Sequence, residues 1–104
     1  MIAWMEVFEA LADPTRRRIV ELLARRERSA GELTRQFEIS QPAVSKHLRV
    51  LREAGVVDVR GVAQRRLYRL DPATLGRAEA WIARHRRFWE ARLDALEEHV
   101  QRED

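Results

Sequence analysis

The sequence contains no cysteine, a single lysine and only four glycines. Without cysteine the chain forms neither a disulfide bond nor a thiolate metal site, although this says nothing about the redox state of its compartment. No apolar run is long enough to cross a membrane, and the first residues carry Glu6 and Glu9 without the basic stretch of a signal peptide. The glycines form no phosphate-binding loop. We therefore expect a cytoplasmic protein.

The basic charge is carried almost entirely by arginine. The chain has 104 residues, enough for one small domain with a thin core, and its formal net charge is +3. Arginine suits bidentate contacts with phosphate or guanine. However, 17 acidic residues accompany the 20 basic ones, so much of this charge can form exposed ion pairs. Charge alone therefore does not establish nucleic-acid binding.

The most informative pattern lies in the middle of the chain. Val44, Leu48 and Leu51 recur at helical spacing and predict a buried side, while Ser40 suits the start of the helix and Gly55 its end. The other sides carry residues that, proline excepted, donate hydrogen bonds: Gln41, Pro42, Ser45, Lys46, Arg49 and Arg52. Such a helix suits the major groove of DNA, although any amphipathic surface helix can share the pattern.

Three further helices are predicted before this one. Residues 1–12 have an apolar face, and Asp13 and Pro14 then start a second helix that runs to about Arg26. The second helix is expected to bury Ile19, Leu22 and Leu23. Ser29 and Glu32 have the spacing of a capping box, which opens a short helix ending near Phe37. The tight link that follows, Glu38 to Ser40, completes a helix-turn-helix arrangement.

After Gly55 the apolar period becomes two. Val57 and Val59 predict one strand and residues 67–70 a second, with a turn over residues 61–64. Polar side chains gather near the tip of this hairpin: Arg60, Gln64, Arg65 and Arg66. A basic hairpin directly after a donor-rich helix is typical of a wing, although an ordinary charged hairpin can have the same sequence pattern. Asp71 and Pro72 then start a long last helix that ends at about Val100.

These motifs together resemble the ArsR (SmtB-like) family of small winged helix-turn-helix repressors, in the branch that lacks sensory cysteines. Residues 5–19, MEVFEALADPTRRRI, look like the family's opening, and residues 45–51 match its S-x-H-L-x-x-L core. Residues 54–57, 60–61 and 68–70 match the end of the recognition helix and the wing. The resemblance implies one mainly α domain over residues 1–104, with about five helices and a two-stranded β-hairpin.

The resemblance also implies a homodimer formed by the first and last helices. The sequence supports this independently, because these helices carry more large apolar side chains than a thin core can hide, and such a surface marks a partner site. The expected interface residues are Trp4, Met5, Phe8, Trp81, Ile82, His85, Phe88, Trp89 and Leu96. The alternative is that these residues complete the core of the monomer.

The sequence departs from the family's metal sensors. One family site uses cysteines, and another uses Asp-x-His with His-x-x-Glu or His-x-x-His on the last helices. Here Ala83 stands two residues before His85, and Arg102 three residues after His99. We therefore expect no metal and no cofactor. A weaker acidic and histidine cluster across a dimer stays open: His85, Glu90, Asp94, His99 and Glu103.

The resemblance implies a repressor, in many members an autorepressor, that occupies an inverted repeat in double-stranded DNA. We expect Gln41, Ser45 and Arg49 to read base edges. The residues expected to position the DNA backbone are Ser40, Lys46, His47, Arg52 and the four wing residues named above. For His47 we expect a hydrogen bond to nearby backbone or to phosphate rather than catalysis, and no catalytic constellation favours an enzyme.

Two alternatives remain open at the level of sequence. One is a sensor that releases DNA when it binds a metal or small ligand, and the other is a dimeric adaptor that does not bind DNA. Arg16, Arg17 and Arg18 oppose the dipole of their helix. The sequence does not decide whether these arginines form ion pairs with the last helix or contact DNA.

Overall fold

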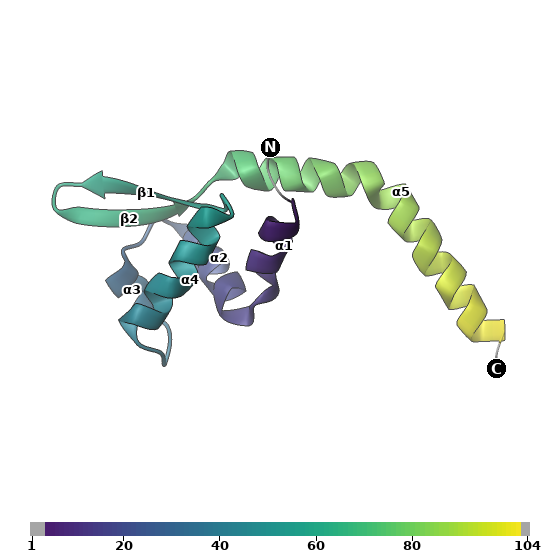
Figure 1. Ribbon diagram of the computed structural model, residues 1–104, viewed down its shortest axis with the longest axis horizontal. Coiled ribbons are helices and arrows are strands. Elements are labelled where there is room, and N and C mark those ends of the chain that lie inside the picture. The colour runs from purple at the N-terminus through teal and green to yellow at the C-terminus, as the bar shows by residue number, and fades with distance from the viewer. Residues whose placement is uncertain (1–3, 103–104) are drawn as a thin grey trace. The chain divides into compact units, whose positions relative to one another are not determined.

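The computed structural model describes residues 4–102, apart from the side chains of Trp4, Trp89, Gln101 and Arg102. The described residues form five helices and one hairpin (Figure 1): α1 (Trp4–Ala12), α2 (Pro14–Arg25), α3 (Ala30–Thr34), α4 (Gln41–Glu53), β1 (Val57–Val62), β2 (Arg65–Leu70) and α5 (Pro72–Arg102). The chain divides into two compact units, residues 1–74 and 75–104. The predicted fold class, mainly helical with a two-stranded wing, is confirmed.

The helices of the first unit begin where polar caps satisfy their free N–H groups. The side chain of Asp13 accepts a hydrogen bond from the backbone of Arg16 at 3.0 Å, and that of Ser40 accepts one from Ala43 at 3.3 Å. Ser29 and Glu32 form the predicted capping box at the start of α3. The start of α5 is capped in the same way by Asp71. Each of these helix starts was predicted correctly from its cap residue.

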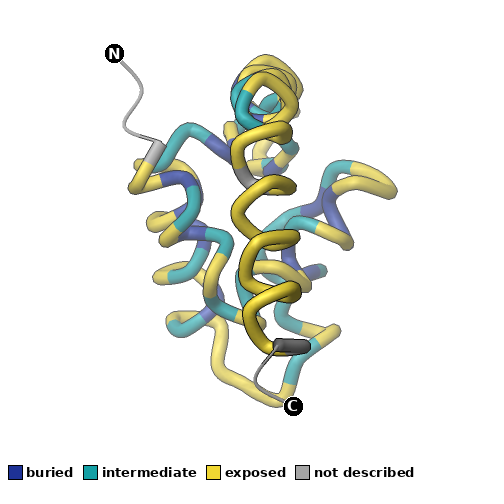
Figure 2. The backbone as a smooth tube through the Cα atoms, turned by 90° about the vertical axis from the view of Figure 1, so that its right-hand side faces the viewer, coloured by how far each residue is buried: buried dark blue, intermediate teal, exposed yellow. Residues whose placement is uncertain are grey.

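The core of the first unit lies between α1, α2, α3, α4 and the start of the wing. The three apolar positions predicted for α2 and the three predicted for α4 are all buried: Ile19, Leu22, Leu23, Val44, Leu48 and Leu51. Val7, Leu33 and Val56 complete this core with no exposed surface. In Figure 2 these buried positions appear as dark blue segments of the tube.

The third helix is shorter than predicted. It ends at Thr34 rather than near Phe37, because the next backbone N–H groups bond three residues back. Gln36 donates to the carbonyl of Leu33 at 2.9 Å, and Phe37 donates to that of Thr34 at 3.1 Å. Such bonds tighten the chain into a 3₁₀-like turn. The link to α4 is therefore longer than the three residues expected from sequence.

The turn of the wing is also shorter than predicted. β1 and β2 pair antiparallel from Val57 opposite Leu70 to Val62 opposite Arg65. Two residues, Ala63 and Gln64, are left for the turn rather than four. Ala63 has a φ of 57°, in the left-handed region that two-residue hairpin turns require.

A third backbone segment pairs with the wing, and the sequence pattern did not predict this pairing. The backbone N–H of Arg28 donates to Tyr68 at 3.1 Å, and that of Tyr68 donates to Arg28 at 2.8 Å. The side chain of Arg28 is buried, and its Nε donates to the carbonyl of Leu22 near the end of α2 at 3.2 Å. This contact fixes the base of the hairpin against the segment between α2 and α3.

The second unit is the greater part of α5. Beyond its first turns the helix is mostly exposed (Figure 2), including the large apolar residues Ile82, Phe88, Leu93, Leu96 and Val100. Within the described residues, no helix combines the length and the apolar character needed to cross a membrane.

Shortening one buried side chain of α4 tests this core. Leu48 is 1% exposed and Val50, on the same helix, is 38% exposed. We expect Leu48→Ala to lower the free energy of unfolding by about 2–5 kcal/mol, because the cavity it leaves collapses only in part. Val50→Ala should change it by about 0.5 kcal/mol or less. Urea unfolding followed by circular dichroism measures both, and equal losses would contradict the assigned burial.

Candidate nucleic-acid interface

The exposed side of α4 carries the donors that the sequence predicted. Gln41, Ser45, Lys46, Arg49 and Arg52 are all exposed, as are the cap residue and the proline of the first turn, Ser40 and Pro42. The opposite side of the same helix is buried. The structure therefore brings these residues together on one surface of the first unit.

Most of these side chains keep their hydrogen-bonding capacity. The side chains of Gln41, Ser45, Lys46 and Arg49 form no hydrogen bond or ion pair with other described residues. Arg52 lies close enough to Asp58 to help lower the pKa of that carboxyl, which is mainly held down by the side chain of Arg69. Donors without internal partners are available to acceptors outside the protein.

His47 is placed differently from the other residues of this set. Its side chain is only 24% exposed, and its Nδ1 accepts a hydrogen bond from Arg16 Nη1 at 3.4 Å. The nearest oxygen of Asp13 lies 3.9 Å from the same nitrogen. The backbone partner expected for this histidine is replaced by these two side chains, because its position on α4 faces the start of α2. Contact with a DNA phosphate stays a prediction.

Two of the three consecutive arginines bind the end of α1. Arg16 donates to the carbonyls of Ala10 at 2.7 Å and Glu9 at 3.2 Å, and Arg17 donates to those of Leu11 and Ala12. The last carbonyls of a helix lack internal partners and carry its negative dipole end, so cations are favourable there. The sequence reasoning missed this role, although three arginines directly after a helix end are a signal for it.

The third arginine, Arg18, and the N-cap residue of α2, Asp13, have partners within α2. Arg18 pairs with Glu21 of its own helix at 3.2 Å. The backbone N–H of Arg16 bonds to the Asp13 carboxylate and holds its pKa below the ordinary value. All three arginines therefore have partners within the first unit.

The four polar residues of the wing differ in their partners. Arg60 bonds to Glu27 at 2.8 Å, and Arg65 forms an ion pair with Glu32. Within the described part of the chain, Gln64 and Arg66 have no such partner and are exposed. Of the predicted wing cations, only Arg66 is therefore without a carboxylate.

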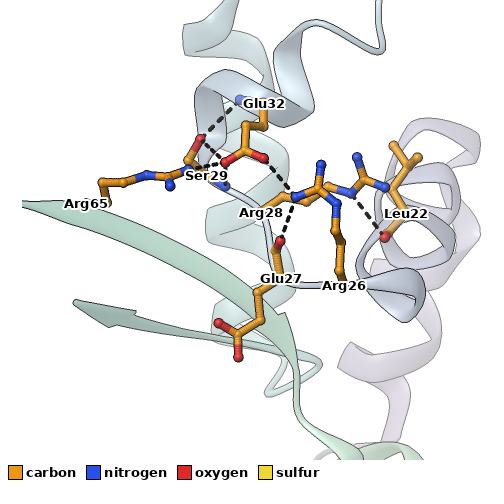
Figure 3. A network of polar contacts seen from close by, with 7 residues as sticks. All are labelled: Leu22, Arg26, Glu27, Arg28, Ser29, Glu32 and Arg65. Carbon is orange, nitrogen blue, oxygen red and sulfur yellow. Dashed lines mark hydrogen bonds and ion pairs between the residues drawn. The ribbon is translucent and has the colours of Figure 1, made fainter. Parts of the chain in front are cut away.

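Glu32 stands at the centre of a polar network beneath the wing (Figure 3). One carboxylate oxygen accepts from Arg26 at 2.9 Å, and the other contacts Ser29 and Arg65. The hydrogen bond from Arg26, followed by that from the backbone of Ser29, lowers the pKa of Glu32 to about 2. The carboxylate is therefore charged at every physiological pH.

The expected interface residues of α1 and α5 are mostly on the surface. Met5, Ile82, Phe88 and Leu96 are exposed, while Phe8, Trp81 and His85 are half-buried. The rings of Trp81 and His85 stack with centroids 4.5 Å apart, and His85 Nδ1 lies 2.8 Å from the carbonyl of Trp81. The side chains of Trp4 and Trp89 lie outside the described residues. Membership of an interface stays a prediction for all nine.

Metal binding receives no support from the described part of the chain. There, no three histidine or acidic side chains are gathered closely enough to hold an ion. Glu103, one member of the cluster considered from sequence, lies outside the described residues.

Comparison with known proteins identifies the family of this chain. Residues 13–59 match the model of the bacterial regulatory protein arsR family. The HTH-type transcriptional regulator Rv2034 of Mycobacterium tuberculosis is 42% identical over 96 residues, 92% of this chain and 87% of that protein. The chain belongs to the ArsR family. The matched segment contains α2, α3, α4 and the first three residues of β1, and therefore includes the exposed donors of α4.

Other relatives agree with this assignment. The transcriptional repressor SdpR of Bacillus subtilis is 37% identical over 76 residues, 73% of this chain and 84% of that protein. An ArsR-like regulator from Rhodococcus sp. RHA1 has a similar structure, with a TM-score of 0.76, 33% identity and coverage of 90% of this chain and 89% of that one. The ArsR-family protein described here is thus a DNA-binding transcriptional regulator and not an enzyme.

The titration of Glu32 tests the network beneath the wing. We expect its side-chain carboxyl to titrate at about pH 2 by NMR. Because the folded-state pKa lies below that of an unfolded chain, the carboxylate stabilises the fold above about pH 4.5 and loses this effect as the pH falls towards 2. Arg26→Ala should raise the pKa more than Arg65→Ala. An ordinary value in the native protein would contradict the network.

Proposed function

We propose that this ArsR-family protein is a homodimeric repressor that occupies an inverted-repeat operator, including one in its own promoter, in the cytoplasm. The observation that carries the proposal is the exposed side of α4, where Gln41, Ser45, Lys46 and Arg49 are held in place without internal partners. A protein-interaction adaptor that does not bind DNA would not need such a surface beside an arginine-rich hairpin. The dimer, once bound to the operator, would block the polymerase from the promoter.

Residues in this surface divide into two roles. Gln41, Ser45 and Arg49 read base edges, and Arg49 suits a bidentate contact with guanine. The remaining members contact the DNA backbone: Ser40, Pro42, Lys46, His47, Arg52, Arg60, Gln64, Arg65 and Arg66. Contacts with phosphate set position and affinity, while contacts with base edges set sequence preference.

The dimer is proposed to form largely through α5. Its exposed residues Ile82 and Leu96 share one side of the helix and Phe88 flanks that side. An apolar surface of this kind marks a site for a partner. The charges along the helix are also segregated. Its first half carries four basic residues, Arg77, Arg84, Arg86 and Arg87, beside one acidic residue, Glu79. Its second half carries four acidic residues, Glu90, Asp94, Glu97 and Glu98, beside two basic ones, Arg92 and Arg102. An antiparallel pair of such helices brings opposite charges together.

Two substitutions separate the reading of bases from the positioning of the backbone. We expect Arg49→Ala to relax preference at one base pair, with a loss of about 1–3 kcal/mol for the preferred base only. Arg66→Ala should weaken binding to all sequences and flatten the salt dependence by about one unit of slope. Fluorescence anisotropy with the chain's own promoter, single-base variants of it and scrambled DNA measures both. Uniform losses in both variants would overturn the division of roles.

A charge placed on the apolar side of α5 tests the dimer. We expect Leu96→Glu to raise the dissociation constant of the dimer at least about tenfold, because the carboxylate loses water in the interface. Ala83→Glu places the same group on the opposite side of the helix and should leave the dimer intact. Sedimentation velocity over a concentration series measures the assembly. A monomeric wild type, or a Leu96→Glu variant that dimerises normally, would contradict the proposal.

A further inference from the structure

Two arginines of the wing are bound to carboxylates that lie earlier in the chain. Arg60 on β1 bonds through its Nε to Glu27 at 2.8 Å, and Arg65 on β2 pairs with Glu32 of α3. Arg69, further along β2, pairs with Asp58 at 3.1 Å. The wing is therefore much less cationic in the free protein than its sequence indicates.

Both ion pairs are open to solvent on the arginine side. The side chain of Arg65 is 60% exposed and that of Arg60 is 49% exposed. Exposed pairs of this kind favour the bound geometry by a factor of only about two to five. A guanidinium recognises carboxylate and phosphate oxygens with the same planar set of donors. A phosphate group can therefore replace either carboxylate at little cost.

The surroundings of Glu32 suit such an exchange. When Arg65 leaves, Arg26 still bonds to one oxygen of Glu32 at 2.9 Å, and the capping box with Ser29 persists (Figure 3). The carboxylate is then still compensated, and the start of α3 still has its cap. Arg65 can therefore leave Glu32 without disrupting the rest of the network.

We propose that Glu27 and Glu32 compete with DNA phosphates for Arg60 and Arg65, and so set the affinity of the wing for DNA. The inference rests on the proposed function, because it needs the wing to approach a duplex. It adds two acidic residues outside the exposed side of α4, whose carboxylates bind the wing arginines in the free protein as DNA phosphates would in the complex. DNA binding then includes the exchange of each arginine from carboxylate to phosphate.

The test compares Glu32→Gln with wild type on non-specific duplex DNA as well as on the promoter, since the exchange involves phosphates only. Glutamine retains the capping box but removes the charge that holds Arg65. We expect Glu32→Gln to bind both DNAs about two to five times more tightly, with a salt slope steeper by up to about one unit. Glu27→Gln should behave in the same direction through Arg60.

Two controls separate exchange from a general charge effect. Glu21→Gln removes one negative charge of α2 whose partner is Arg18 rather than an arginine of the wing, and should leave affinity nearly unchanged. In an Arg65→Ala background, Glu32→Gln should no longer tighten binding. Thermal melts confirm that each variant is folded.

Three results would overturn the inference: unchanged or weaker binding by folded Glu32→Gln, equal tightening by Glu21→Gln, or full tightening without Arg65. The proposed function fails separately, if wild type prefers the promoter no more than scrambled DNA. In that case binding to non-specific duplex still decides the exchange, and a wild type that binds no duplex at all overturns both.

Discussion

The burial of one side of α4 is the constraint on which the rest of the structure depends. A helix of 13 residues is marginal on its own in water, so its exposed donors form a fixed surface only because the opposite side is packed. Val44, Leu48 and Leu51 are each at most 1% exposed, and burial of such side chains contributes about 1.5–3 kcal/mol each. The donors proposed to contact DNA are thus held in place by residues that are themselves buried.

Arginine serves three different purposes in this chain, and its number alone does not distinguish them. Arg16, Arg17 and Arg28 donate to carbonyl oxygens at the ends of helices. Others bind carboxylates, as Arg60 and Arg65 do beneath the wing. A third group has no internal partner among the described residues, and it includes Arg49 on α4 and Arg66 on β2 of the wing. The local surroundings of each arginine, rather than net charge, define the surface offered to DNA.

The sequence predicted the features that depend on neighbouring residues. Helix starts at Asp13, Ser29 and Ser40 follow from caps a few residues long, and the buried sides of α2 and α4 follow from periodicity. The missed features join residues far apart in the chain. The bridge between Arg28 and Tyr68 and the pairs beneath the wing depend on how the segments fold together, and single residues leave no periodic signal. The two turns were misjudged for a local reason, because backbone bonds of 3₁₀ type and a positive φ decided them.

Arg16 links two parts of the first unit that have different proposed uses. Its guanidinium binds the last carbonyls of α1, the helix that carries Met5 and Phe8, and it also donates to His47 on the buried edge of α4. Because a guanidinium is rigid and planar, these bonds constrain one another. A displacement of α1 that breaks the carbonyl bonds also moves the donor that faces His47. Arg16 is therefore one of the contacts that tie the position of α4 to that of α1.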